Sequence, residues 1–289
     1  MKPPPFSYSA PSTVTEVIGL LTEHAEAEPR LLAGGQSLIP LMNFRLAQPR
    51  HLVDLRNVAE LTGLRLDGDV LVIGAMTRQS EVERSPEVVL AAPLLAEAIG
   101  LVGHTPIRNS GTVGGSLAHA DPAAELPAAL LALDADLVAV GPAGTRTIAA
   151  REFLRGPFST ALAADELLSE VRVPRQHGGY AFVEFTRTHG NFAIVAVAAV
   201  VELDGTEIRR AALALTGVAP TAIRATDAVD VLTGAPPDAA TITAAADAAV
   251  AGVHPASDLH ASAATRSALA RTYVRRALEL AISRAQDQR

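Results

Sequence analysis

Apolar positions recur at helical spacing in several stretches of the chain. Thr13 and Glu16 have the spacing of a capping box, and the apolar residues after them predict a short amphipathic helix. Residues 81–102 are predicted to be helical with interruptions at two prolines, and residues 126–133 are expected to form a shorter helix. A last helix is predicted from about Thr265. The residues expected on its apolar face are Leu269, Tyr273, Ala277, Leu278 and Ile282.

Continuous or alternating apolar runs predict the strands. Strands are expected in residues 30–37, 51–57, 69–77, 192–203 and 209–220, with a hairpin at 135–148. The longest apolar run, residues 192–201, is about half the length needed to cross a bilayer, so it is predicted to be a buried strand. A polar, glycine-rich segment at 175–180 separates a larger front half from a smaller back half. The mixture of helices and strands predicts an α+β fold.

The composition excludes several classes of function. The chain has 289 residues, of which 49% are hydrophobic and 19% charged, so it can bury a sizeable core. Its formal net charge is −7 and it has no block of Lys and Arg, which argues against nucleic-acid binding. It has no cysteine, so it cannot form disulfides or hold Cys-ligated zinc or iron–sulfur clusters. We expect a cytoplasmic protein without a signal peptide or transmembrane segment.

Two glycine-containing segments are candidates for ligand binding. They read "AGGQSLIP" at residues 33–40 and "SGTVGGSLAHADPAAELP" at residues 110–127. Glycine permits close approach of a ligand to the backbone, and successive N–H groups form a concave surface suited to phosphate oxygens. Each segment alone is more often only a turn. Because both join a Gly-Gly pair to a hydroxyl residue, together they predict a diphosphate held from two sides.

Other motifs for cofactors or metals do not fit. Neither segment reads G-x-G-x-x-G, G-K-[ST] or G-x-S-x-G, so a dinucleotide fold, a P-loop and a nucleophile elbow are unsupported. His119 and Asp121 are too few to define a metal site. Asp121 precedes a proline, and it either forms a turn or accepts a hydrogen bond from a ribose hydroxyl.

Three basic residues have two interpretations each. Arg108 precedes the second segment and either contacts phosphate or pairs with a carboxylate; the second interpretation is favoured. Arg187 and His189 precede Phe192 at the start of the long predicted strand. They form either a solvated surface or an edge near a ligand ring, with Phe192 packing and Arg187 biasing the charge. The sequence leaves both interpretations open.

Several stretches, taken in order, resemble a known family. "AGGQSLIPLM", "LVDL", "IGAMT", "IRNSGTVGGSLAHADPAAELPAALLALDA" and "DELLSEVRVP" are similar to the FAD-binding medium subunit of the molybdenum hydroxylases, the family of carbon monoxide dehydrogenase and xanthine dehydrogenase. "DLHASAATRSALARTYVRRAL" resembles the C-terminal domain of that family. The resemblance extends over nearly the whole chain.

The resemblance implies a domain plan. Residues 1–176 would form a p-cresol methylhydroxylase-type FAD-binding domain with subdomains at about 1–57 and 58–176. Residues 177–289 would form a small C-terminal α+β domain with an antiparallel sheet and helices. FAD would lie in the cleft with its diphosphate between the two glycine segments.

The resemblance also assigns cofactor-binding residues. They are Ala33, Gly34, Gly35, Gln36, Ser37 and Leu38 in the first segment, Thr112, Val113, Gly114, Gly115 and Ser116 in the second, and Asp121, Glu125 and Leu168 beyond them. Asp121 and Glu125 would lie near the adenosine half, and Leu168 would pack on the flavin.

Three positions depart from the family pattern. Glu125 stands where the pattern has Asp, and Asn191 stands where an Asp is expected. A Lys expected near Val183 or Glu184 is missing. These departures bear on the reduction potential of the flavin and on the electron acceptor.

The resemblance implies a role within a complex. The partners would be a large subunit with the molybdenum cofactor and a small subunit with two-iron iron–sulfur clusters, and electrons would pass through FAD to an external acceptor. FAD would be bound noncovalently, and no catalytic acid or base and no metal ligand is assigned to this chain. The alternatives are a stand-alone flavin oxidase of the same fold and a non-redox nucleotide-binding scaffold subunit.

Overall fold

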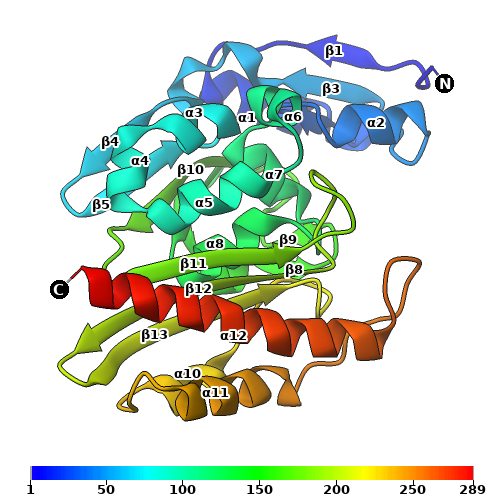
Figure 1. Cartoon of the computed structure of the whole chain (residues 1–289). Coiled ribbons are helices and arrows are strands. Elements are labelled where there is room, and N and C mark those ends of the chain that lie inside the picture. Colours follow the sequence, from blue (N-terminus) through cyan, green and yellow to red (C-terminus); the bar gives the residue numbers. More distant parts are fainter. Residues whose placement is uncertain (1, 289) are drawn as a thin grey trace.

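The computed structural model describes residues 2–288. The N-terminal part has a small parallel sheet with strand order β1-β3-β2, covered by a helix (Figure 1). Its elements are β1 (Ser7–Ser9), α1 (Val14–Glu23), η1 (Ala25–Ala27), β2 (Arg30–Leu32), α2 (Leu38–Asn43), β3 (His51–Asp54), η2 (Leu55–Asn57) and η3 (Ala59–Leu61).

The predicted capping of α1 is confirmed. The Thr13 hydroxyl accepts a hydrogen bond from the Glu16 N–H at 3.2 Å, and the Glu16 carboxylate turns back to the Ser12 N–H at 2.7 Å. Val17 and Leu21 are buried, as their helical spacing predicts. The helix is thus fixed at its start and packed along one face.

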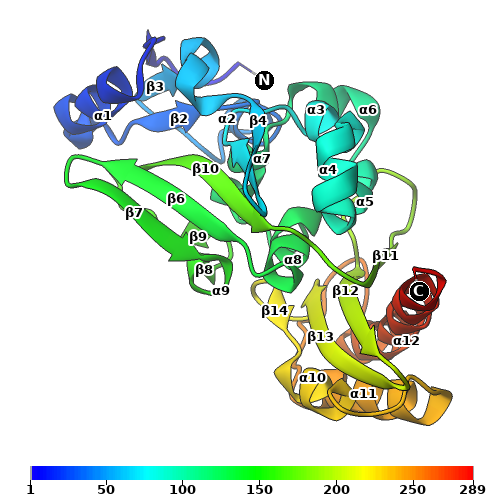
Figure 2. The same cartoon turned by 90° about the vertical axis from the view of Figure 1, so that its left-hand side faces the viewer.

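The second part is built on a five-stranded antiparallel sheet with strand order β4-β5-β10-β6-β7, visible in Figure 2. Its strands are β4 (Leu64–Asp67), β5 (Val70–Gly74), β6 (Asp136–Gly141), β7 (Gly144–Ala149) and β10 (Leu167–Pro174), with a small pair formed by β8 (Leu154–Gly156) and β9 (Ser159–Thr160). Its helices are α3 (Gln79–Arg84), α4 (Pro86–Ala91), α5 (Pro93–Leu101), α6 (Thr105–Ser110), α7 (Val113–His119), α8 (Glu125–Ala132) and α9 (Ala150–Phe153).

Two prolines divide the helical segment between β5 and α6, as predicted. Pro86 begins α4 and Pro93 begins α5, at the first helical position, where the missing proline N–H costs no helical hydrogen bond. The Ser85 hydroxyl caps α4 by accepting a hydrogen bond from the Val88 N–H. The three short helices α3, α4 and α5 pack together, and α4 contacts β5 at one end of the sheet (Figure 2).

The back half is a four-stranded antiparallel sheet with strand order β11-β12-β13-β14. Its elements are β11 (Gly179–Phe185), β12 (Val195–Asp204), β13 (Glu207–Thr216), β14 (Ile223–Arg224), α10 (Thr226–Leu232), α11 (Ala239–Ala251) and α12 (Ala263–Asp287). Figure 1 shows α12 along one face of this sheet, while α8 of the front half packs on the other face. The predicted α+β class is confirmed.

The bounds of several predicted strands are wrong. In the front half, the strand predicted at 51–57 ends at Asp54, and the strand predicted at 69–77 covers Val70–Gly74. β12 begins at Val195 instead of residue 192, because residues 188–191 form a hydrogen-bonded turn. β13 ends at Thr216 because Gly217 has a φ of +79°, which takes the chain out of the sheet. The apolar residues thus extend beyond the hydrogen-bonded strand before β12 and after β13.

The buried face predicted for α12 is confirmed at Ala277, Leu278 and Ile282 and is wrong toward the start of the helix. Leu269 and Tyr273 lie only half-buried at its border. The buried positions are Arg266, Ala270, Val274, Ala277, Leu278, Ala281, Ile282 and Ala285. Small residues line this face because α12 lies very close to β11: a Cβ added at Gly179 would come within 2.9 Å of the Ala285 Cα. Of the helices in residues 2–288, none is long and apolar enough to span a membrane.

Candidate functional site

The two glycine segments meet in the structure. We call residues 33–38 the first glycine loop and residues 110–116 the second glycine loop. A Cβ added at Gly34 would come within 2.7 Å of the Gly111 Cα and closer still to the Ser110 carbonyl oxygen. A Cβ added at Gly115 would come within 3.0 Å of the Ala33 Cβ. Glycine is therefore required for the two loops to touch.

The first glycine loop offers unused backbone donors. It leaves β2 and enters α2, and Gly35 takes a φ of +73° to make this turn. Within residues 2–288, no acceptor is hydrogen-bonded to the N–H groups of Gly34, Gly35, Gln36 or Ser37. Successive free N–H groups in a tight turn form an anion-binding concavity. This loop therefore has the donors that a phosphate group requires.

The second glycine loop differs, because most of its backbone donors are already used. The donor–acceptor pairs are Val113 N–H to Thr77 O at 3.1 Å, Gly114 N–H to Ala75 O at 2.8 Å, Gly115 N–H to Thr112 Oγ1 at 3.0 Å and Ser116 N–H to Thr112 O at 3.1 Å. The loop is tied to the end of β5, and Gly114 has no room for a side chain beside Ala75. Its glycines serve close packing. That this loop binds the cofactor stays a prediction, in which the loop contributes the shape of the binding site.

Arg78 lies at the junction of the two loops and was not singled out from the sequence. Its Nη1 donates a hydrogen bond to the Ser110 carbonyl, and its main chain bridges to Thr112. Its side chain forms no ion pair with any carboxylate in residues 2–288. The only available signal was its position directly after "IGAMT".

Arg108 is committed to a carboxylate, as the favoured interpretation predicts. Its Nε and Nη2 donate to the two carboxylate oxygens of Glu83 at 2.8 and 3.1 Å, and its Nη1 donates to the Val102 carbonyl at 3.1 Å. The side chain is buried. Its guanidinium donors are therefore already used within the protein.

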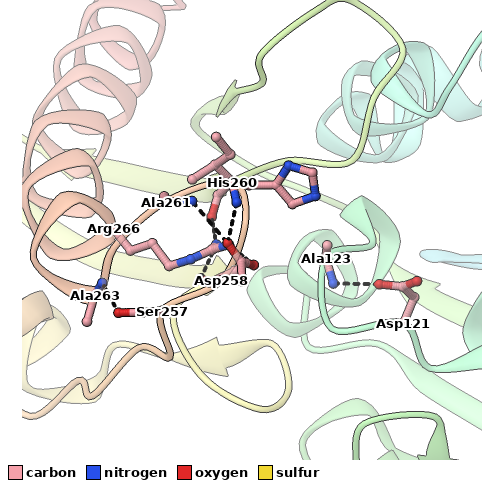
Figure 3. A network of polar contacts seen from close by, with 10 residues as sticks. Asp121, Ala123, Ser257, Asp258, His260, Ala261, Ala263 and Arg266 are labelled. Atoms are coloured by element: carbon pink, nitrogen blue, oxygen red, sulfur yellow. Dashed lines mark hydrogen bonds and ion pairs between the residues drawn. The ribbon is translucent and has the colours of Figure 1, made fainter.

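Asp121 forms a turn, which confirms one of its two interpretations. Its Oδ1 accepts a hydrogen bond from the Ala123 N–H at 2.9 Å (Figure 3). The neighbouring His119 packs on Phe158. Burial lowers the pKa of its imidazole, and the charge of Asp121 offsets this effect only in part. Within residues 2–288, no group of three or more potential ligands could hold a metal ion.

The Asp121 turn is bonded to the back half of the chain. The Pro122 carbonyl accepts hydrogen bonds from the Thr216 hydroxyl at 2.5 Å and from the Gly217 N–H at 3.4 Å. The Gly217 carbonyl in turn accepts from Arg266, whose Nη2 donates to Asp258 at 2.5 Å. Figure 3 shows the part of this network around Asp258 and Arg266, together with the Asp121 turn. The front and back halves therefore meet at the turn that precedes α8.

Glu125 and Leu168 are both buried. Glu125 begins α8 and is 2% exposed; burial, the nearby Glu184 and Asp121 raise the pKa of its carboxyl group to about 8. Leu168 lies on β10 at a register shift in the main core. The next residue, Ser169, accepts a hydrogen bond from the Ala75 N–H at 2.8 Å. Leu168 is thus close to the strand end that holds the second glycine loop, and its contact with a flavin stays a prediction.

Residues 186–192 form the exposed connection between β11 and β12. The Asn191 side chain donates to the Thr188 hydroxyl at 2.7 Å, and Phe192 is 61% exposed. His189 contacts His104 of the front half, with ring centroids 5.7 Å apart. This connection therefore reaches the front half, and its role beside a ligand ring stays a prediction.

Two family models cover most of the chain. Residues 4–176 match the FAD binding domain in molybdopterin dehydrogenase. Residues 180–281 match the CO dehydrogenase flavoprotein C-terminal domain.

Curated relatives are similar over their full length. The chain is 42% identical over 288 residues to the 6-hydroxypseudooxynicotine dehydrogenase complex subunit alpha of Paenarthrobacter nicotinovorans, covering 99% of this chain and 97% of that relative. It is 41% identical over 286 residues to the carbon monoxide dehydrogenase medium chain of Hydrogenophaga pseudoflava, covering 98% and 99%.

Solved structures agree with these relatives. A chain of carbon monoxide dehydrogenase from Hydrogenophaga pseudoflava superposes with a TM-score of 0.97 at 41% identity, covering 99% of this chain and 100% of that one. A chain of quinoline 2-oxidoreductase from Pseudomonas putida 86 gives a TM-score of 0.95 at 38% identity, covering 99% of each.

Proposed function

The chain belongs to the family of FAD-binding medium subunits of molybdenum hydroxylases, and from this premise we propose that it is the electron-transfer subunit of such a complex. It takes electrons from the iron–sulfur clusters of a small partner subunit and passes them to an external acceptor. A large partner subunit carries the molybdenum cofactor and oxidises the substrate. Because the chain has no cysteine, such clusters must lie in another subunit.

The contact between the two glycine loops is the observation that supports FAD binding by this chain. A side chain at Gly34 or Gly115 would fill the junction, and the free N–H groups of the first loop lie beside it. These residues therefore fit a diphosphate. Bound FAD supplies the redox chemistry, and the protein supplies binding, orientation and electrostatics.

The residues have separate tasks in this proposal. The N–H groups of Gly34 to Ser37 donate to the diphosphate, and the second glycine loop fixes the shape of the cradle. Asp121 and Glu125 line the adenosine side, and Leu168 supports the flavin from the core. Residues 1–176 make up the FAD-binding domain, with subdomains at about 1–57 and 58–176. Residues 177–289 make up the C-terminal domain.

A noncovalent FAD is the first testable consequence. The chain has no cysteine that could tether a flavin, and neither glycine loop contains a histidine. We expect the purified protein to be yellow and to release all its flavin as FAD after acid denaturation and filtration. Colour that stays with the polypeptide would contradict noncovalent binding, and release of FMN would contradict a diphosphate cradle.

Colour and copurification also separate the alternatives. A colourless chain that binds no added FAD would support a non-redox scaffold. Copurification with a large and a small subunit would disfavour a stand-alone oxidase. The genes adjacent to the coding sequence would identify the large subunit, and with it the class of substrate.

A further inference from the structure

Two acidic side chains lie at the contact between the two halves without a basic partner. Glu125 at the start of α8 is buried, and Glu184 on β11 is partly buried. Within residues 2–288, neither side chain forms an ion pair, and no other side chain donates a hydrogen bond to either one. The Oε2 atom of Glu184 is buried without any partner. Isolated buried carboxylates are strongly unfavourable, so this pair requires an explanation.

The register of the sheet turns Glu184 toward α8. Glu184 is paired with Ala196, and Ala196 is paired with Thr216. Directly opposite residues in an antiparallel sheet point to the same face, so Glu184 shares the face of Thr216. The Thr216 hydroxyl bonds to the Pro122 carbonyl, just before Glu125. The two glutamates therefore approach each other from different halves of the chain.

The other charged groups near the pair do not neutralise it. Asp121, in the turn before α8, adds another negative charge, and His119 of α7 interacts with Asp121. Arg284 of α12 is bonded to a glutamate of α5. Arg224 of β14 is bonded to an aspartate at the far end of α8. These two arginines are therefore used elsewhere.

Burial and mutual repulsion both favour the protonated form of these carboxyl groups. Burial, with smaller contributions from the charges of Glu184 and Asp121, raises the pKa of Glu125 to about 8, although a hydrogen bond from its own main chain acts to lower it. Burial raises the pKa of Glu184 to about 7. Both directions follow from the geometry, because two carboxylates in a poorly solvated contact cannot readily ionise together.

We propose that Glu125 and Glu184 form a proton-binding site that keeps about one proton between the two halves of the chain at neutral pH. The proton prevents repulsion between α8 and β11. When it is lost at alkaline pH, two negative charges face each other across the contact and favour separation of the halves. Weakened FAD binding at that pH is a further consequence, and this consequence rests on the proposed function.

Infrared spectroscopy of the full chain without FAD tests the proton directly. The parent should show the carbonyl band of a protonated carboxyl group at pH 7. Glu125→Gln should remove most of this band, and Glu184→Gln should shift its titration to lower pH by about one unit, because a like charge is gone. Glu60→Gln, at an exposed position, should change neither.

The outcomes are decisive even if one variant fails to fold. A parent without the band, or a band unaffected by Glu125→Gln, overturns the site. An unshifted titration in Glu184→Gln overturns the pairing, and circular dichroism identifies a variant that is unfolded. If only one variant folds, Glu125→Gln still tests the site or Glu184→Gln still tests the pairing. The parent spectrum shows in either case whether a protonated carboxyl group is present.

FAD titrations examine the consequence for the cofactor. Between pH 7 and pH 9, the FAD dissociation constant of the parent should rise by about tenfold, and that of Glu184→Gln should rise less. Equal rises in both would overturn the effect on FAD. If the parent binds no FAD at any pH, the proposed function fails, whereas the infrared result stands independently.

Discussion

At the scale of single residues, Gly34 is the most demanding position of the proposed cradle. An alanine here would place its Cβ within 2.7 Å of the Gly111 Cα, against backbone that cannot rotate away. Such overpacking costs about 1–3 kcal/mol, and separation of the loops would misplace the free N–H donors. We therefore expect Gly34→Ala to weaken FAD binding by about tenfold or more, because each 1.4 kcal/mol is about tenfold. Titration of the apoprotein by flavin fluorescence measures this change.

Gly19 provides the matched control for Gly34. It lies on the exposed side of α1, and a Cβ added there meets nothing within 4 Å. Gly19→Ala should keep the parent affinity. Gly178, in the glycine-rich segment between the two halves, would be a poor control, because its φ is +76° and a Cβ would come within 3.0 Å of Glu202 Cα. Parent-like FAD affinity in Gly34→Ala would show that the first glycine loop is only a turn.

At the scale of elements, Arg266 fixes the start of α12. Its Nη1 donates to the Ile194 and Gly217 carbonyls at 2.5 and 2.9 Å, and its Nη2 donates to Asp258. Arg266→Met would leave two carbonyl groups without a donor, and would remove one partner of a partly buried ion pair. We expect a loss of about 3 kcal/mol in the free energy of unfolding, because each buried acceptor left without a donor costs about 1–3 kcal/mol. Denaturant unfolding of the full chain measures it.

The same helix supplies the control. Arg271 pairs with Asp247, but both side chains are more than half exposed. An exposed pair contributes about 0–1 kcal/mol, so Arg271→Met should change the free energy of unfolding little. If both variants lose the same amount, the buried network has no special role and helix propensity explains the result.

Local signals predicted most elements, and long-range contacts decided the rest. Proline at the first helical position predicted the breaks before α4 and α5, and Thr13 predicted the start of α1. In contrast, the acceptors for the second glycine loop come from the end of β5. The sequence alone could not show that these N–H groups were already used. The two glycine loops looked equivalent in sequence and differ in the structure for that reason.

At the scale of the whole molecule, the contact between the halves was the least predictable feature. Glu125 was singled out by its place in a family pattern, and Glu184 only because a lysine was missing nearby. Their approach depends on sheet register and on the bonds between Pro122 and β13. Neither the sheet register nor these bonds can be predicted from the local sequence. A carboxyl pair here makes the contact between the halves sensitive to pH.

The pH dependence of overall stability follows from this pair. The raised pKa of Glu125 means that the folded chain binds a proton that the unfolded chain releases. Its stabilising contribution is therefore fully present below the ordinary pKa of glutamate, near 4.5, and is lost as pH rises through about 8. Glu125→Gln cannot ionise, so its stability relative to the parent should increase from pH 5 to pH 9. Thermal unfolding across this range measures the difference, and a constant difference would contradict the assignment.

A whole-molecule prediction follows from the division of labour within the complex. The chain has no cysteine for iron–sulfur clusters, and its relatives are named as subunits or medium chains of larger enzymes. The isolated FAD-loaded chain should therefore leave its flavin absorbance unchanged when mixed anaerobically with aldehydes, purines or other N-heterocycles. Dithionite should bleach the same sample, which shows that the flavin can be reduced. Rapid bleaching by any one of the organic compounds would mean that this chain oxidises substrate by itself, and would support a stand-alone oxidase.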